Sequence, residues 1–228
     1  MRLQTLAKRV WDSRWGQFAC VMAALTLGAG LVWVIAARAN HSLAYWYLLW
    51  NLFLAWVPFV LGAALVFTAR RYGWQSLQSF AMFVLWLFFL PNTFYMLTDY
   101  VHLQEFVRSN VMLDVVMFTL FVLNGLALGF SSVLMVHRAV VQKVSGRVIG
   151  IGLAALFLLS SLAMYLGREL RWNSWDVVSN PFGIVFNVSD LIIHPGAHPQ
   201  AFEMILLFFG FLAVMYFAVW RIAGIVQK

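Results

Sequence analysis

Charged side chains are scarce in this sequence. Only 10% of its 228 residues are Asp, Glu, Lys or Arg, whereas soluble globular domains carry about 25%. This scarcity excludes an ordinary water-soluble domain. The 15 basic residues outnumber the 8 acidic ones, but they lie in short segments between apolar runs. They therefore do not form the continuous basic face of a nucleic-acid-binding protein, and we expect no nucleic-acid partner.

Cysteine is almost absent as well. Cys20 is the single cysteine, so the chain can form neither an intrachain disulfide nor a zinc site made of cysteines. The sequence also shows no long-period repeat, no coiled-coil heptad and no low-complexity tract. These absences leave the long apolar runs as the main guide to the fold.

Apolar residues make up 64% of the chain, and its mean hydropathy is +0.86. Segments of about 20 apolar residues are long enough to cross a bilayer as helices. The sequence predicts an all-α, polytopic membrane helix bundle that forms a single integral membrane domain over residues 1–228 and has polar loops at its outer face. The expected spans are 17–37, 44–68, 76–95, 112–136, 148–167 and 201–220, with an outer loop over 168–200. The first span exceeds the core of a signal peptide, so we expect it to be retained as an anchor.

The distribution of basic residues predicts the orientation. Eleven of them lie in the N-terminal segment, the loops after the second and fourth spans and the C-terminal segment, and four lie in the other loops. Basic residues concentrate in cytoplasmic loops, so both termini are predicted to be cytoplasmic. Seven of the eight acidic residues and four of the five histidines then fall on or near the outer side. We therefore expect the functional site at the outer face.

The first polar stretch is Leu90–Glu105, LPNTFYMLTDYVHLQE. Pro91 has no backbone N–H and disrupts the helix there, and Asn92 follows it. In a resumed α-helix, Asp99 and His102 would share one face, with Glu105 at its edge.

Three interpretations fit Asp99 and His102. A carboxylate beside an imidazole can perform acid–base catalysis, which makes them the candidate catalytic residues. They could also bind a metal with a third ligand such as Asp114, Glu169 or Asp176, although we predict no metal site. The third interpretation is a structural or ligand-contacting polar pair.

The second polar stretch, 167–176, reads GRELRWNSWD. In a helix, Arg168 and Arg171 would lie one turn apart, where they could hold a phosphate or carboxylate. Tryptophans beside arginines can stack on them or on an acyl or sugar group. The alternative is that the arginines neutralise the nearby carboxylates. The candidate substrate-binding residues are Asn92, Arg168, Arg171, Trp172, Asn173, Trp175 and Asp176, with Asp114 and Glu105 as additional candidates.

Polar and small residues inside the spans have simpler interpretations. Asn51 and Asn124 are expected to bridge helices, and the pairs Gly125/Gly129 and Gly146/Gly150 to let helix backbones approach closely. In 177–200, prolines and glycines argue against a regular helix across the second half. Without a helix, His194 and His198 do not share one face despite their spacing of four residues, which argues against a metal role for them. The apolar part of the segment is expected to lie in the outer interface or to cover the two polar stretches.

Four blocks carry a family resemblance: LPNTFYMLTDYVHL, YLGRELRWNSWDVVSNP, WNLFLAWVP and VLNGLALG. They resemble a bacterial family of integral membrane proteins known as domain of unknown function 1361. The resemblance implies a multi-pass protein of the bacterial inner membrane and supplies no activity or cofactor. It also supports the two polar stretches as shared motifs. This chain departs from the family pattern at Thr93, where a small residue is usual, and at Glu169, where an apolar one is usual.

Three functions remain open. The first is a lipid-modifying protein in which Asp99 and His102 act on a substrate with an anionic head group, held by the arginines and tryptophans. The second is a transporter or solute-binding protein, and the third is a non-catalytic scaffold or partner subunit. The expected partners are the lipid bilayer and an anionic lipid or lipid-linked substrate. The sequence identifies neither a cofactor nor a protein partner.

Overall fold

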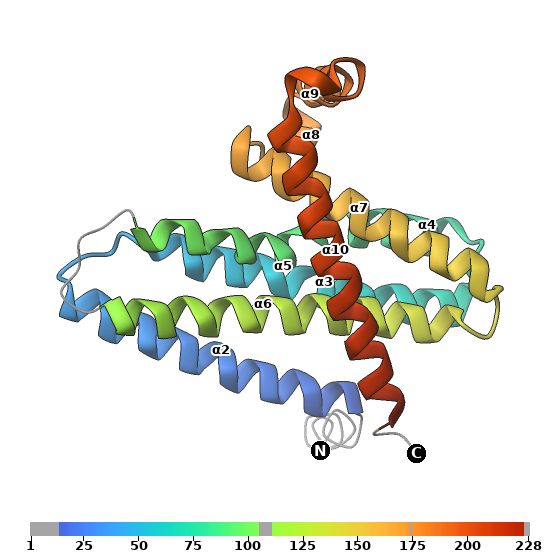
Figure 1. The fold of residues 1–228 in the computed structure, drawn as a ribbon. Coiled ribbons are helices and arrows are strands. Elements are labelled where there is room, and N and C mark those ends of the chain that lie inside the picture. The colour runs from blue at the N-terminus through green and yellow to red at the C-terminus, as the bar shows by residue number, and fades with distance from the viewer. Residues whose placement is uncertain (1–13, 105–110, 174, 226–228) are drawn as a thin grey trace.

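A computed structural model describes residues 14–104, 111–173 and 175–225. Over these residues the chain forms helices and no strand. Figure 1 shows their arrangement. In chain order the elements are α2 (Arg14–Ala39), α3 (Trp46–Tyr72), α4 (Leu77–Phe89), α5 (Pro91–Tyr95), η1 (Met96–Gln104), α6 (Val111–Val140), α7 (Gly146–Glu169), α8 (Asp176–Ser179), α9 (Pro181–Ile193), η2 (Pro195–Ala197) and α10 (Pro199–Ile225).

Six of the helical segments are long and apolar enough to cross a membrane, which confirms the polytopic all-helical fold. They are Trp15–Ala39, Trp46–Tyr72, Leu77–Leu103, Val111–Val140, Gly146–Glu169 and Pro199–Ile225. Each overlaps one predicted span and extends beyond at least one of its ends. The largest difference is in the third, which continues through α5 and η1 past the predicted end at residue 95.

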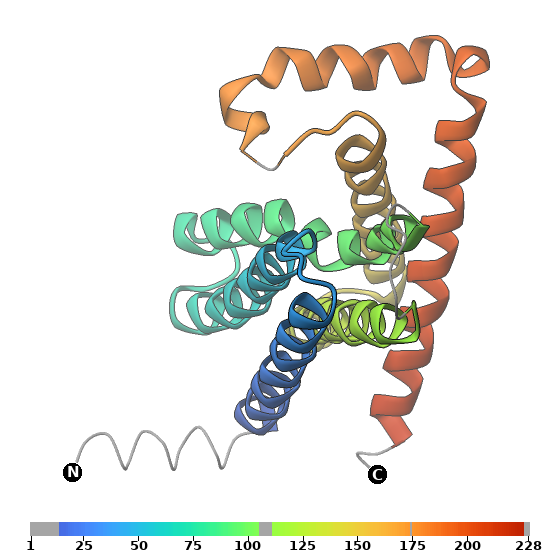
Figure 2. The same ribbon diagram turned by 90° about the vertical axis from the view of Figure 1, so that its left-hand side faces the viewer.

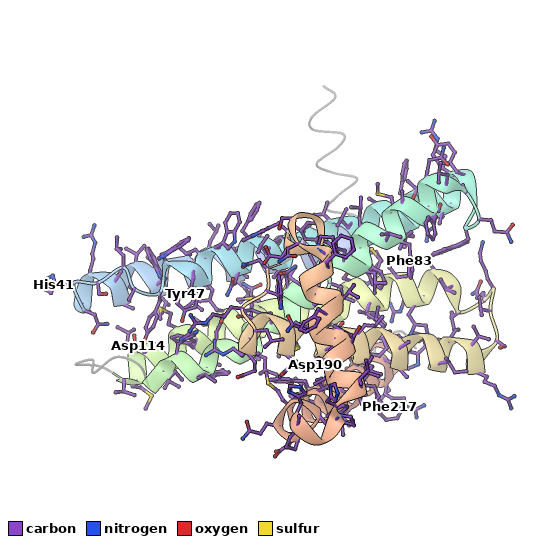
Figure 3. All side chains as sticks on the ribbon, turned by 90° about the horizontal axis from the view of Figure 1, so that it is seen from above. His41, Tyr47, Phe83, Asp114, Asp190 and Phe217 are labelled. Carbon is purple, nitrogen blue, oxygen red and sulfur yellow. The ribbon has the colours of Figure 1, made fainter. Side chains whose placement is uncertain are left out.

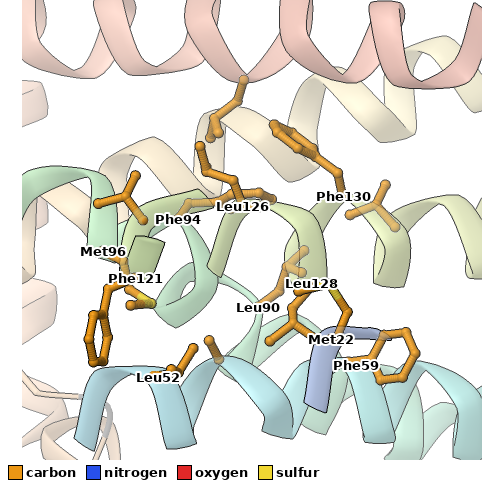
Figure 4. Close-up of a cluster of buried hydrophobic side chains, with 14 of the residues drawn as sticks. Met22, Leu52, Phe59, Leu90, Phe94, Met96, Phe121, Leu126, Leu128 and Phe130 are labelled. Carbon is orange, nitrogen blue, oxygen red and sulfur yellow. The ribbon is translucent and has the colours of Figure 1, made fainter. Parts of the chain in front are cut away.

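The helices pack around α3 and α6. α3 contacts both α4 and α6, α2 contacts α6, and α7 contacts α10. Figures 1 and 2 show α10 crossing α3 and α6 steeply, while α9 runs crosswise to α10. Figure 4 shows the core between α3, α5 and α6, where Leu52, Phe94 and Phe121 are buried.

The turns with most of the basic residues lie at one end of the bundle. Figure 1 shows the α3–α4 turn, which follows Arg70 and Arg71, beside the α6–α7 turn, which contains Lys143. Figure 3 places His41 at the opposite end. This alternation of ends agrees with the pattern of basic residues, and the side of the membrane that each end faces stays a prediction.

A chain of polar groups joins α3, α4 and α6 inside the bundle. The indole N–H of Trp86 donates to Ser132 Oγ at 2.8 Å, and the Ser132 hydroxyl donates to the Pro58 carbonyl at 2.7 Å. Gly62 makes room for these groups, because a Cβ there would lie 2.7 Å from Ser132 Oγ. Polar groups within a membrane protein must find hydrogen-bond partners inside the protein. Here the Ser132 hydroxyl of α6 links α4 and α3 by accepting one hydrogen bond and donating another.

Pro91 ends α4, as the sequence predicts, and the chain continues as α5 and then η1. The following turn packs against α6 at its glycines. A Cβ on Gly129 would lie 2.8 Å from Phe94 Cε1 and also clash with the Thr93 hydroxyl, and one on Gly125 would lie 2.8 Å from the Thr93 carbonyl oxygen. The predicted close approach at Gly125 and Gly129 is confirmed.

The corresponding expectation for Gly146 and Gly150 is wrong. A Cβ at either position would meet nothing within 4 Å. Both residues are exposed at the start of α7, where no neighbouring helix approaches. The spacing alone cannot tell which face of a helix meets a neighbour.

Candidate functional site

A cavity of about 610 Å³ lies where the first half of α3, the α4–η1 segment and the second half of α7 meet. Residues of the α7–α9 connection and Ile184 of α9 complete its wall. The polar residues in the wall are Tyr47, Asn51, Asn92, Tyr95, Asp99, His102, Ser160 and Asn173, and the tryptophans are Trp46, Trp50, Trp172 and Trp175. The cavity thus brings together residues of both polar stretches that are about 70 positions apart in the chain.

Asp99 is held in the wall by an amide from α3. Its side chain is 1% exposed, and Asn51 Nδ2 donates to Asp99 Oδ2 at 3.1 Å. Asp99 lies in η1, a 3₁₀-helix, whereas the sequence suggested an α-helix. With three residues per turn, side chains at i and i+3 lie directly in line, so Asp99 and His102 both face the cavity.

His102 is held by groups from two other helices. Arg168 Nη1 lies 2.7 Å from His102 Nε2. Because a guanidinium can only donate, His102 Nε2 is placed as the acceptor in this contact. The Tyr47 ring packs 5.2 Å from the imidazole centre, and the Tyr45 hydroxyl donates to the His102 carbonyl at 3.3 Å.

Arg168 adds a positive charge behind this wall. It is half-buried at the end of α7 and interacts electrostatically with both Asp99 and Tyr95. Asp99 is the single carboxylate among the described residues that line the cavity. Arg168 is close enough to Asp99 for an electrostatic interaction, although it is not itself part of the cavity wall.

The chain reverses direction directly after α7, and this separates the two arginines. α7 ends at Glu169, Arg171 has a left-handed φ of 57°, and the Trp172 N–H donates to the Leu166 carbonyl at 3.1 Å. A left-handed residue after a helix end is usually glycine; here it is an exposed arginine. The helical interpretation of 167–176 is therefore wrong beyond Glu169. Neither arginine is part of the cavity wall. Arg168 contacts His102, which lines the cavity, whereas Arg171 is exposed, so the predicted pair of arginines is not formed on one helix face.

Trp172 is fixed against α9. Its indole N–H donates to Asn187 Oδ1 at 3.1 Å, and a Cβ on Gly183 would lie 2.6 Å from its ring. Asn173 and Trp175 also line the cavity. The segment predicted to be a loop thus contains the helix α9, whose inner side closes part of the site.

Asp176 has a local role outside the cavity wall. Its carboxylate accepts the Asn173 backbone N–H at 2.6 Å and the Ser179 hydroxyl at 3.2 Å. It therefore stabilises the turn that presents Asn173 and Trp175.

The other predicted residues have different positions. Asn92 lines the cavity and donates to the Phe89 carbonyl at 3.0 Å. Asp114 is 4% exposed near the start of α6 but is not part of the cavity wall. Glu105 lies outside the described residues. The structure places Asn92 in the site and Asp114 elsewhere.

No group of three or more His, Cys, Asp and Glu among the described residues could hold a metal. His194 and His198 instead contact Asp190: His194 Nδ1 lies 2.8 Å from Oδ1 and His198 Nε2 lies 2.8 Å from Oδ2. These contacts join the end of α9 to the start of α10.

Three residues of the cavity wall were not predicted as site residues from the sequence: Tyr47, Asn51 and Tyr95. Asn51 was expected only to bridge helices. It does bridge α3 and η1, but its partner is the buried carboxylate. The sequence feature that could have identified Asn51 as a site residue is a polar amide inside an apolar span, in the block WNLFLAWVP, which resembles the family pattern.

The fold defines a multi-pass membrane protein, and residues of both polar stretches line one cavity between its helices. The sequence pattern of the family "Protein of unknown function (DUF1361)" matches residues 50–215. The chain belongs to this family, and the match includes both polar stretches. No curated protein and no solved structure matches the chain.

Proposed function

We propose that the protein binds an amphiphile from the bilayer, with the anionic head group in the cavity and the apolar part directed towards lipid. The observation that carries the proposal is the composition of one wall. Asp99, His102 and Asn173 lie within the same cavity as four tryptophans, and Arg168 lies directly behind His102. Apolar cavities with a few convergent polar groups are typical of small-molecule sites.

The apolar boundary of the cavity supports a lipid-like ligand. Trp50, Leu159 and Val177 line the cavity and are 44%, 51% and 46% exposed. In a membrane-spanning bundle, such outward apolar side chains adjoin acyl chains. A ligand can therefore enter sideways from the bilayer, with its polar group reaching Asp99 and His102.

Arg168 would supply selectivity for an anionic group. Its guanidinium contacts His102 Nε2 at 2.7 Å. A phosphate or carboxylate is a stronger acceptor for a guanidinium than an imidazole, because the bond is then between two charges. The bound anion would replace His102 as the partner of Arg168, and the released imidazole could accept a proton from the ligand.

The experiment is native mass spectrometry of the purified protein with anionic and zwitterionic lipids that have identical acyl chains. Arg168→Gln should weaken anionic-lipid binding by about 10-fold or more, since a hydrogen bond to a charged group contributes about 1.5–3 kcal/mol. Arg171→Gln is the matched control, since Arg171 is an exposed arginine only three positions along the chain, and its effect should stay within about 2-fold. An equal loss in both variants would attribute binding to the general surface charge and contradict the proposal.

Acid–base chemistry on the bound head group is the catalytic extension of this proposal. The observation that favours it is the pair Asp99 and His102 in line on η1, facing one cavity. Asp99→Asn and His102→Gln should still bind lipid but abolish any time-dependent mass change of the bound molecule. A wild-type protein that leaves every bound lipid unchanged would limit the function to binding.

A through-membrane transport path has less support. The cavity is lined by the first half of α3, whereas the second half of α3 is packed tightly, with Gly62, Leu65 and Ala69 buried. Uptake by protein reconstituted in liposomes would contradict this view.

A further inference from the structure

The outward side of α9 is an apolar stripe. Phe182, Val185, Phe186, Ile192 and Ile193 are each 61–86% exposed. Their spacing places them on one face of a helix, and the stripe includes no charged residue. α9 has 13 residues, whereas a transmembrane helix needs about 20. α9 is therefore too short to cross the bilayer.

The inner side of α9 fixes the direction in which the stripe points. Asn187 accepts the indole N–H of Trp172 at 3.1 Å. Ile184 lines the cavity, and Leu191 is buried with Ala201 and Ile205 of α10. Because these contacts hold α9 from its inner side, the helix cannot turn its apolar stripe inward without breaking them.

Polar groups lie at both ends of α9. Asn180 caps the first turn by accepting the Gly183 N–H at 3.1 Å. At the other end, the Asp190 carboxylate contacts both His194 and His198 at 2.8 Å. Figure 2 shows α9 running crosswise to α10 after this corner. A short helix with an apolar face and polar ends is typical of a helix that lies in the membrane interface.

We propose that α9 lies along the membrane interface, with this apolar stripe inserted among lipid acyl chains beside the mouth of the cavity. The next long helix also exposes apolar side chains: α10 follows η2 directly, and its Leu206 and Leu207 are 60% and 66% exposed. An apolar stripe of this size exposed to water would favour association with other proteins, whereas insertion among acyl chains would remove the stripe from water. The proposal is independent of what the cavity binds.

The test is spin labelling in liposomes, in a Cys20→Ser background so that each variant carries one thiol. Phe186→Cys and Ile193→Cys place the label on the stripe and remove no buried side chain. Gly196→Cys is the matched control: this position is exposed in η2, and an added Cβ meets nothing within 4 Å. Each label is measured for collision with oxygen, which partitions into acyl chains, and with a water-soluble nickel chelate.

Insertion predicts that labels 186 and 193 collide with oxygen and are protected from the chelate by about 5-fold or more relative to label 196, because the hydrocarbon layer excludes charged solutes. Collision with the chelate equal to that at 196 would place the stripe in water and overturn the proposal. Protection from both reagents would mean that protein covers the stripe, and it would overturn the proposal as well. Val185→Cys repeats the measurement on the same face if either variant fails to purify as a monodisperse protein.

Discussion

The guanidinium Nη1 of Arg168 lies 2.7 Å from Nε2 of His102, and this contact joins the end of α7 to η1. The two residues belong to different polar stretches and are 66 positions apart. The contact fixes the imidazole at the cavity wall and brings a positive charge close to Asp99. The relationship leads to the first prediction.

Arg168 and His102 should be energetically coupled. Arg168→Gln and His102→Ala should each lower the free energy of unfolding in detergent by about 1–3 kcal/mol. The double variant should lose less than the sum, by about 0.5 kcal/mol or more, because both changes remove one contact. The control pair, Arg171→Gln with His102→Ala, should be additive. Additivity in both pairs would show that the Arg168–His102 contact does not stabilise the protein.

Asn51 should stabilise Asp99 as a hydrogen-bond donor. Asn51→Leu leaves a carboxylate that is 1% exposed without its amide donor, which should cost about 1–3 kcal/mol or more because the group can be charged. Adding Asp99→Asn should recover part of the loss, since burying a neutral amide costs less than burying a charge. Thermal unfolding of the two variants checks this, and a further loss on adding Asp99→Asn would contradict it.

Gly129→Ala should destabilise the bundle by about 1–3 kcal/mol, because overpacking forces neighbouring groups to shift. The added Cβ would clash with the buried Thr93 and Phe94. Gly150→Ala is the control, with nothing within 4 Å of its Cβ, and alanine there should be neutral or stabilising as a better helix former. The measurement is the unfolding midpoint in detergent. Equal unfolding midpoints for the two variants would show that α5 can move away from α6 without any loss of stability.

The corner between α9 and α10 should weaken in acid. Hydrogen bonds from His194 and His198 hold the pKa of the Asp190 carboxyl below its ordinary value, which is about 3.9. Because the folded pKa is the lower one, this stabilisation is complete above the ordinary value and is lost as the pH falls through the folded pKa.

Carbon-13 NMR of labelled aspartate checks this pH dependence. The Asp190 carboxyl should titrate below the ordinary midpoint, and the titration should return to about 3.9 in a variant with His194→Ala and His198→Ala. A midpoint that does not change between the two proteins would rule out the histidines as the cause.

Hydropathy was sufficient to predict the six spans, because about 20 apolar residues have few alternatives to a membrane helix. The close approach at Gly125 and Gly129 was also readable from the sequence. The sequence selected Asp99, His102 and the tryptophan block as candidates, and the structure places Asp99, His102, Trp172 and Trp175 around one cavity.

The details that failed all depend on tertiary contacts. Arg171 adopts a left-handed conformation that local preference assigns to glycine, so a helical interpretation of 167–176 was reasonable but wrong. The partner of Asn51 is 48 positions away, and no local pattern indicates such a pairing. The helix α9 was hidden by flanking prolines that begin and follow it without interrupting it.

The 3₁₀ geometry of η1 also determines how far the third span reaches. A 3₁₀-helix rises about 2.0 Å per residue and an α-helix about 1.5 Å. Over the nine residues of η1, rewinding to an α-helix would shorten the segment by about 4–5 Å. An α-helix would keep Asp99 and His102 on one face but offset around the axis, whereas the 3₁₀ form places them directly in line. The alignment of these two side chains is thus tied to the length of the helix that carries them.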